Sequence, residues 1–422
     1  MFRILTGAWF LIDYISMIVI GRVHEAYIDS TLNFPFYGLE FIKPLPGLWM
    51  YLIFALTALG GLGIMLGYRY RLSLGLFFSL HLYVFLIDIV YTLNKFYLFL
   101  ILAFVLFFME AHRFWSLDVK QGRVKELRTV PRWNILIFQV FYGLIYTYSG
   151  ISKINPDWLF HGQPLRTFFG YRWLFSWMPE GLFNATVFGF TYCGMIFDLT
   201  ITWLLTFHKT RKVGNLLQAS FHSLNFFILG IGTLSIYMAL TTWLLFPTPW
   251  LVKKLGLEKF EGEEEIPEST RKLTVVSLSI FLLVNLLLPH RHYLAESNVN
   301  LSEKGHRFSW RLMTRTKSGS ASLFFVVDPK SKEQWAINPR EYLTRRQYRK
   351  MSGETDLVLV FAHWLEEEWK KKGYEDVEVY GQINVRLNGR NVQYLVDPEQ
   401  DLTKVSRSYV EDKVTMPLLP RE

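Results

Sequence analysis

The sequence predicts a polytopic α-helical membrane protein with about nine transmembrane helices, followed by a C-terminal α+β domain outside the cytoplasm. Hydrophobic residues make up 51% of the 422 residues, more than an ordinary soluble core needs. Aromatic residues reach 17%, as is typical of helices anchored at lipid headgroups. Residues 1–290 carry only 40 charged side chains, whereas residues 291–422 carry 41. We therefore expect a transmembrane domain, 1–290, and a soluble domain, 291–422.

Apolar runs mark the candidate membrane spans, because about 17 to 25 such residues cross a bilayer as a helix. The runs cover residues 3–20, 47–66, 72–91, 97–110, 133–151, 185–206, 214–230, 234–248 and 273–289. The fourth, seventh and eighth runs are short. Breaks in the last two of these are expected at Gly230, Gly232 and Pro247.

The basic residues in the loops predict the orientation of these spans. Alternate loops on one side carry 16 Lys and Arg residues, and those on the other side carry 6. The positive-inside rule then places the N-terminus in the cytoplasm. After nine crossings the soluble domain lies on the opposite side, which in a bacterium is the outer side of the inner membrane.

The soluble domain reads as a mixture of strands and helices. Residues 321–327 form a β-like apolar run, and residues 357–372 have helical periodicity. Residues 377–387 and 390–396 flank Asn388-Gly389, which predicts a hairpin with a type I′ turn. Its 22 basic and 19 acidic residues nearly balance, so charge gives no support for a nucleic-acid partner.

Cysteine is almost absent from the chain. Cys193 is the single cysteine, so neither an intramolecular disulfide nor a thiol-pair metal site can form within one chain. We expect no metal site.

Ionisable residues inside the predicted spans are costly, and they usually pair with one another or serve a functional site. They are Asp13, His81, Asp88, Asp198 and His222, with Lys95 and Lys153 at the outer helix ends. The residue pattern alone does not decide between structural pairing and a functional site for any of these residues. His81 and His222 could also ligate a b-type haem, although the sequence lacks the further paired histidines expected of such proteins.

Lys153 stands where the fifth span opens into a polar loop. Burial favours the neutral form of an amine, which can act as a base. Spacing alone favours the alternative, in which the lysine anchors a helix end in water.

Several segments carry recognisable motifs, in chain order AHRFWSLD at 111–118, YSGISKINPDWL at 148–159, GMIFDL at 194–199, FHSLN at 221–225 with GIG at 230–232, GHRFSWRLM at 305–313 and FAH at 361–363. Together they resemble the vitamin K-dependent gamma-carboxylases and their bacterial homologues with the horizontally transferred transmembrane domain. The resemblance covers nearly the whole chain.

The resemblance implies an enzyme that deprotonates a reduced quinone, vitamin K hydroquinone or menaquinol, so that it reacts with O2. The strong base that results removes a proton from a protein glutamate, and the carbanion takes up CO2. The family's catalytic lysine falls on Lys153. The implied catalytic residues are Lys153, His222 and Lys95, and the implied binding residues are Asp88, Asn94, Asp157, Trp158, Asp198 and Asn225. Implied partners are the lipid bilayer, the quinone pool and a secreted or membrane protein that carries the glutamate.

Residues 88–95, DIVYTLNK, depart from the family pattern, because the histidine of the family's reaction centre falls on Lys95. The expected enzyme is a glutamyl carboxylase, a carbon–carbon lyase with quinol epoxidase activity. Two alternatives stay open: an epoxidase or oxygenase without carboxylation, and a non-enzymatic quinone sensor or scaffold. We expect one cavity near the outer membrane face to collect Asp88, Asn94, Lys95, Lys153, His222 and Asn225.

Overall fold

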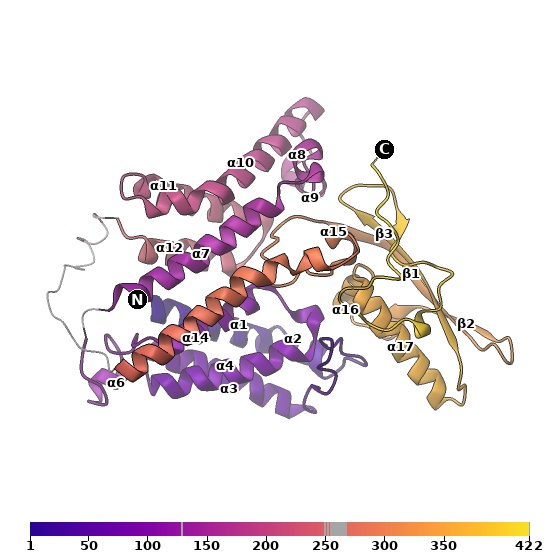
Figure 1. Ribbon diagram of the computed structural model, residues 1–422, viewed down its shortest axis with the longest axis horizontal. Helices are drawn as coiled ribbons and strands as arrows, with labels where there is room; N and C mark the ends of the chain where they lie inside the picture. Colours follow the sequence, from indigo (N-terminus) through magenta and orange to yellow (C-terminus); the bar gives the residue numbers. More distant parts are fainter. Residues whose placement is uncertain (128–129, 249, 251–252, 254–267, 422) are drawn as a thin grey trace.

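A helical bundle joined to a soluble α+β domain makes up the protein (Figure 1). The computed structural model describes residues 1–127, 130–248, 250, 253 and 268–421. In Figure 1 the long helices of the bundle run mainly along the long axis of the molecule, and the sheet lies beyond one end of them. Most of the basic loop 249–272, which contributes to the charge count above, lies outside the described residues.

Each predicted span overlaps a helix of the bundle. These helices are α1 (Phe2–Val19), α3 (Leu48–Leu66), α4 (Tyr70–Ile87), α5 (Asn94–Phe107), α7 (Arg132–Ser152), α10 (Glu180–Thr206), α11 (Arg211–Leu224), α12 (Thr233–Leu245) and α14 (Glu268–Leu287). In the described part of the chain, the helices α1, α3, α4, α7, α10 and the segment that contains α14 are long and apolar enough to cross a membrane. Helices α5 and α12 are apolar but shorter. The structure thus supports a membrane protein, and nine crossings remain a prediction.

Short helices close the ends of the bundle. Helix α6 (Leu117–Lys120) lies at the end away from the sheet, and α2 (Arg22–Tyr27), α8 (Pro156–His161) and α9 (Leu165–Gly170) lie at the end that faces the soluble domain (Figure 1). Helices α1 and α3 pack at backbone contact: a Cβ atom on Gly7 would lie 2.3 Å from the backbone nitrogen of Met65. Only glycine permits this approach.

Helix α11 does not continue regularly into α12. Its last turn widens into a π-helical segment, Asn225–Leu229, and Gly230 and Gly232 then adopt φ values of 68° and 78°. The predicted breaks at these two glycines are confirmed. Such π-helical turns are frequent at functional sites, and this one begins three residues after His222.

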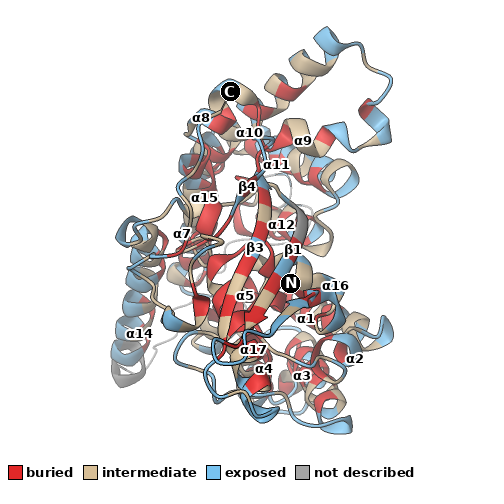
Figure 2. Ribbon diagram, turned by 90° about the vertical axis from the view of Figure 1, so that its right-hand side faces the viewer, coloured by how far each residue is buried: buried red, intermediate tan, exposed pale blue. Residues whose placement is uncertain are grey.

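The soluble domain is built on a four-stranded antiparallel sheet in the order β2-β1-β3-β4. Its strands are β1 (Lys317–Val327), β2 (Gln334–Ile337), β3 (Glu378–Leu387) and β4 (Gln393–Tyr394), and its helices are α15 (Val299–Ser302), α16 (Arg345–Met351) and α17 (Thr355–Lys371). Figure 2 shows the buried residues gathered along β1, β3 and α17. The predicted strand at 321–327 and helix at 357–372 are confirmed.

The predicted hairpin is confirmed at its turn and shorter than predicted beyond it. Asn388 and Gly389 have φ values of 49° and 72°, and the backbone N–H of Arg390 donates to the carbonyl of Leu387 over 2.9 Å. Positive φ at both central residues defines the type I′ turn. Strand β4 spans only two residues, and between the turn and this strand Arg390 pairs with Asp157 of α8.

Candidate functional site

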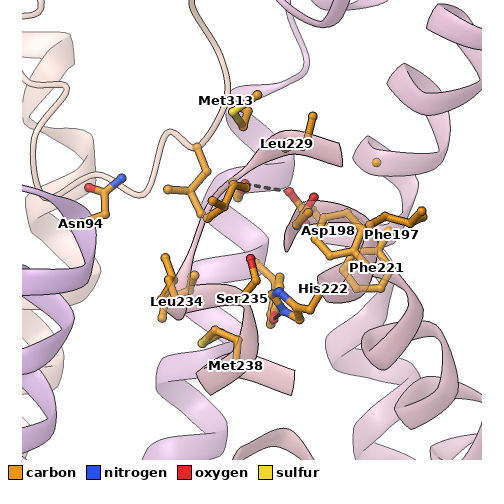
Figure 3. Close-up of a pocket in the computed structure, with 18 of the residues that line it drawn as sticks. Asn94, Phe197, Asp198, Phe221, His222, Leu229, Leu234, Ser235, Met238 and Met313 are labelled. Atoms are coloured by element: carbon orange, nitrogen blue, oxygen red, sulfur yellow. Dashed lines mark hydrogen bonds between the residues drawn. The ribbon is translucent and has the colours of Figure 1, made fainter. Parts of the chain in front are cut away.

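A large cavity lies between the bundle and the soluble domain. Its volume is about 1300 Å³, and its walls come from α1, α5, α7, α10, α11, the π-helical segment, α12 and residues 306–315 of the soluble domain. Figure 3 shows part of it, with apolar side chains such as Phe197, Phe221, Leu234 and Met238 around a few polar groups. A largely apolar cavity with few converging polar groups is typical of a small-molecule site.

Lys153 forms a buried ion pair in this cavity. The residue caps the C-terminus of α7, and its Nζ lies 2.5 Å from Oδ2 of Asp198 on α10. The same Nζ donates to Ser149 Oγ over 2.6 Å, and Ser149 Oγ donates to that Oδ2 over 2.7 Å. All three side chains are buried. Amine, hydroxyl and carboxylate thus form a closed hydrogen-bonded triangle.

The crossing of α7 and α10 brings these groups together. A Cβ on Gly150 would lie 2.8 Å from side-chain atoms of Leu199, so glycine lets the two helices approach next to Ser149 and Asp198. Trp158 supports the cluster from α8. Its indole ring centroid lies 5.2 Å from Nζ of Lys153, at a distance suited to a cation–π contact.

Lys95 makes a second ion pair in the same cavity. Its Nζ lies 2.5 Å from Oδ2 of Asp13 on α1, and Thr233 Oγ1 donates to the other carboxylate oxygen over 3.1 Å. Asn94, next to Lys95 on α5, also lines the cavity and faces it from the side opposite Asp198 (Figure 3). The sequence singled out Asp13 as a costly residue, but nothing in the sequence paired it with Lys95.

His222 presents one ring nitrogen without a protein partner. The Nε2 atom lies 2.8 Å from the hydroxyl of Tyr146, and that hydroxyl in turn accepts a hydrogen bond from Gln218 Nε2. The Tyr146 hydroxyl can donate its own proton to Nε2, an arrangement that places the proton of a neutral imidazole on Nδ1. Among the described residues, no side chain or backbone group pairs with this buried Nδ1. His222 thus offers a donor to a ligand in the cavity.

Five of the six residues expected to converge do line this cavity: Asn94, Lys95, Lys153, His222 and Asn225. Asp198 and Trp158 line it as well. Asp88 is absent from the described lining residues, contrary to the prediction. Its Oδ1 accepts from the backbone N–H of Val90 over 2.8 Å, and its Oδ2 accepts from Gln347 of α16 over 3.1 Å. Asp88 therefore ties the bundle to the soluble domain.

Asp157 also lies outside the described lining and anchors the soluble domain. Its Oδ2 accepts from Asn388 over 2.9 Å and from Arg390, and Arg421 lies 3.3 Å from Oδ1. Burial alone would raise the pKa of this carboxyl group, but the bonds from Arg390 and Asn388 outweigh it and hold the pKa below its usual range. Sequence motifs marked both aspartates, whereas the contacts that join each of them to the soluble domain come from residues more than 200 positions away.

His81 is poorly placed for a haem. Its Nδ1 lies 2.5 Å from the hydroxyl of Tyr14, and its Nε2 lies 2.8 Å from the carbonyl of Phe96. Both ring nitrogens are engaged by the protein, so neither is free to ligate iron. The structure therefore argues against a haem held by His81 and His222.

Fold and cavity define a polytopic membrane protein in which a soluble domain contributes to the wall of a cavity that holds a buried lysine. Residues 1–250 match the family model described as the HTTM domain. Residues 270–421 match the model described as the vitamin K-dependent gamma-carboxylase, lumenal domain. The chain belongs to the vitamin K-dependent gamma-carboxylase family, as its motifs indicated. No solved structure matches the chain.

Proposed function

We propose that the protein is a quinol-dependent glutamyl carboxylase, with its N-terminus in the cytoplasm and its soluble domain on the other side. The observation that carries this proposal is the triangle of Lys153, Ser149 and Asp198 at the wall of a cavity that also holds Lys95 and His222. The soluble domain contributes residues 306–315 to the same cavity. A glutamate on a protein and a lipid-soluble quinol could therefore meet in one cavity.

The residues present fit a reduced quinone such as vitamin K hydroquinone or menaquinol. A cavity of about 1300 Å³ with apolar walls suits a ring system with an isoprenoid side chain. The unpartnered Nδ1 of His222 suits a quinol oxygen as a hydrogen-bond acceptor. Together with O2, a bound quinol would supply the strong base that removal of a proton from glutamate requires.

Lys153 must be neutral before it can accept a proton, and Asp198 provides the means. Transfer of one proton from Nζ to Oδ2 over their 2.5 Å contact converts the ion pair into a neutral amine and a neutral acid. This transfer leaves net charge unchanged, and burial of both side chains reduces the advantage of the charged pair. The neutral amine then takes the quinol proton and, as an ammonium, stabilises the anion left beside it.

Lys95 favours a second candidate function, quinol epoxidation without carboxylation. An imidazole can accept and donate a hydrogen bond at once, whereas an ammonium only donates. The ion pair with Asp13 further offsets the charge of Lys95. Glutamate handling is therefore expected to be weaker than quinol oxidation.

Product analysis tests both functions. The purified protein is incubated with reduced vitamin K or menaquinol, O2, labelled CO2 and a glutamate-containing peptide, and omission of quinol or O2 serves as the control. We expect quinone epoxide and labelled carboxyglutamate. Epoxide without label would establish the second function. Absence of both products, with retained quinone binding, would refute both and leave a non-enzymatic sensor or scaffold.

A further inference from the structure

A second, smaller chamber adjoins the large cavity. Its volume is about 140 Å³, and it lies among the outer end of α1, α2, α4, the segment between α4 and α5, and α16. Ser16, Leu93 and Lys95 line both spaces, so they form the wall between them. Lys95 therefore faces the cavity on one side and this chamber on the other.

Positive charge gathers around the chamber. Arg22 and Arg346 line it together with Lys95, and no Asp or Glu is among the described residues that line it. Arg346 lies with its guanidinium over the ring of Tyr91, 5.2 Å from the centroid, and its Nε donates to the carbonyl of Val90 over 3.4 Å. Burial and the nearby charge of Arg22 lower the pKa of Arg346. Two arginines thus line a small space whose described lining holds no carboxylate.

Nearby carboxylates offset the charge of Lys95, but none in the described part of the chain forms an ion pair with Arg22 or Arg346. Asp13 pairs with Lys95, and Asp88 is occupied by Val90, Asn33 and Gln347. Glu25 lies close enough to influence Tyr91 but does not line the chamber. Cations held together in a partly buried space are costly unless an anion joins them.

Two tyrosines also line the chamber. Burial raises the pKa of Tyr27, so that its hydroxyl stays protonated as a neutral donor, whereas the hydroxyl of Tyr91 contacts Thr344 Oγ1 over 3.3 Å. A water molecule takes up about 30 Å³ of liquid, so the space suits a small oxyanion with a few waters. Guanidinium groups bind such oxyanions through paired N–H donors.

We propose that this chamber binds a small oxyanion, of the size of bicarbonate or inorganic phosphate, between Arg22 and Arg346. Ile20 at the outer end of α1 also lines the chamber and is 63% exposed, so a lipid phosphate is the other source of the same chemistry. The small volume favours the free ion. Binding needs no catalytic turnover, so the test is independent of carboxylation.

Isothermal titration calorimetry of the full-length protein in detergent tests the proposal. Sodium bicarbonate and sodium phosphate are titrated separately at constant ionic strength maintained with sodium chloride. We expect saturable binding of one ion per chain. The double variant Arg22→Gln/Arg346→Gln should weaken binding tenfold or more. Arg345→Gln, which removes an exposed arginine from the same helix, should leave it unchanged.

Arg346→Lys provides a second variant that keeps the charge but loses the planar pair of donors, and it should also weaken binding. Absence of saturable binding of either ion to the wild type would overturn the proposal, as would equal binding by the double variant. Phosphorus analysis distinguishes the source. One tightly retained phospholipid per chain that is lost in the double variant, with no response to dissolved ions, would assign the chamber to a lipid headgroup and overturn the free-ion form.

Discussion

Two lysine–aspartate pairs face the same cavity, and their surroundings differ. Both have a contact of 2.5 Å, but the side chain of Lys153 is 6% exposed and that of Lys95 is 24% exposed. Lys153 also donates to Ser149 Oγ, whereas Thr233 supports the aspartate of the other pair. Burial reduces the solvation of the charged state, so the Lys153 pair is better suited to exchange a proton internally. The same two residue types can therefore serve different roles.

Each lysine also stands near an aspartate that holds the soluble domain. Asp157 follows Lys153 by four positions and binds the turn at Asn388, whereas Asp88 precedes Lys95 by seven and binds Gln347. The soluble domain therefore contacts the bundle within seven residues of each lysine.

Removal of each amine gives the largest expected contrast. Lys153→Ala should reduce quinol oxidation by about 100-fold or more, because general base catalysis typically contributes that much or more. Lys95→Ala should reduce it by less than about tenfold, since Lys95 is not assigned the quinol proton. Initial rates of epoxide formation under saturating quinol measure both. Equal losses of quinol oxidation in the two variants would contradict the different roles assigned to the two lysines.

Removal of each carboxylate should lower the stability of the protein by a different amount for each lysine–aspartate pair. Asp198→Asn leaves the buried ammonium of Lys153 without its counter-ion, which costs about 3–5 kcal/mol when a buried pair is broken. Asp13→Asn should cost about 1 kcal/mol, because Lys95 reaches water more easily. Thermal unfolding in detergent compares them. A larger loss of stability in Asp13→Asn than in Asp198→Asn would contradict the conclusion that burial distinguishes the two ion pairs.

Restoration of the family histidine tests the Lys95 pair alone. Lys95→His should raise the ratio of carboxylated glutamate to quinone epoxide, because an imidazole can accept and donate at once. Quinol oxidation itself should change little. Both products are quantified in one reaction with labelled CO2. An unchanged ratio would show that the lysine at this position has no consequence for the carbon chemistry.

Acidification should weaken the contact of Asp157 with the soluble domain. This weakening should be smallest near neutral pH. The folded-state pKa of this carboxyl lies below its usual value of about 3.9, so its contribution is complete above that value and is lost as the pH falls through the lowered pKa. Limited proteolysis of wild type and Asp157→Asn between pH 3 and pH 7 follows this contact. A difference in proteolysis between wild type and Asp157→Asn that grows on acidification would contradict the expected direction of this pH dependence.

Sequence reasoning placed helices where the bundle has them, predicted an α+β fold after them, and named seven of the residues that line the cavity, because hydropathy and motifs are local signals. It missed the pairing of Asp13 with Lys95 and the bond from Gln218 to Tyr146, since both join helices distant along the chain. It also assigned Asp88 and Asp157 to the site. A buried aspartate in a motif indicates a strong constraint, but only the fold reveals that the constraint is contact between domains.

The most direct test of the central role of Lys153 is chemical rescue of Lys153→Ala. The variant is first shown to bind quinol, and its rate of quinol oxidation is then measured with increasing concentrations of small primary amines. We predict a low rate that rises and saturates with added amine, and no such response in Lys95→Ala. Unimpaired quinol oxidation by Lys153→Ala without any amine would contradict the account.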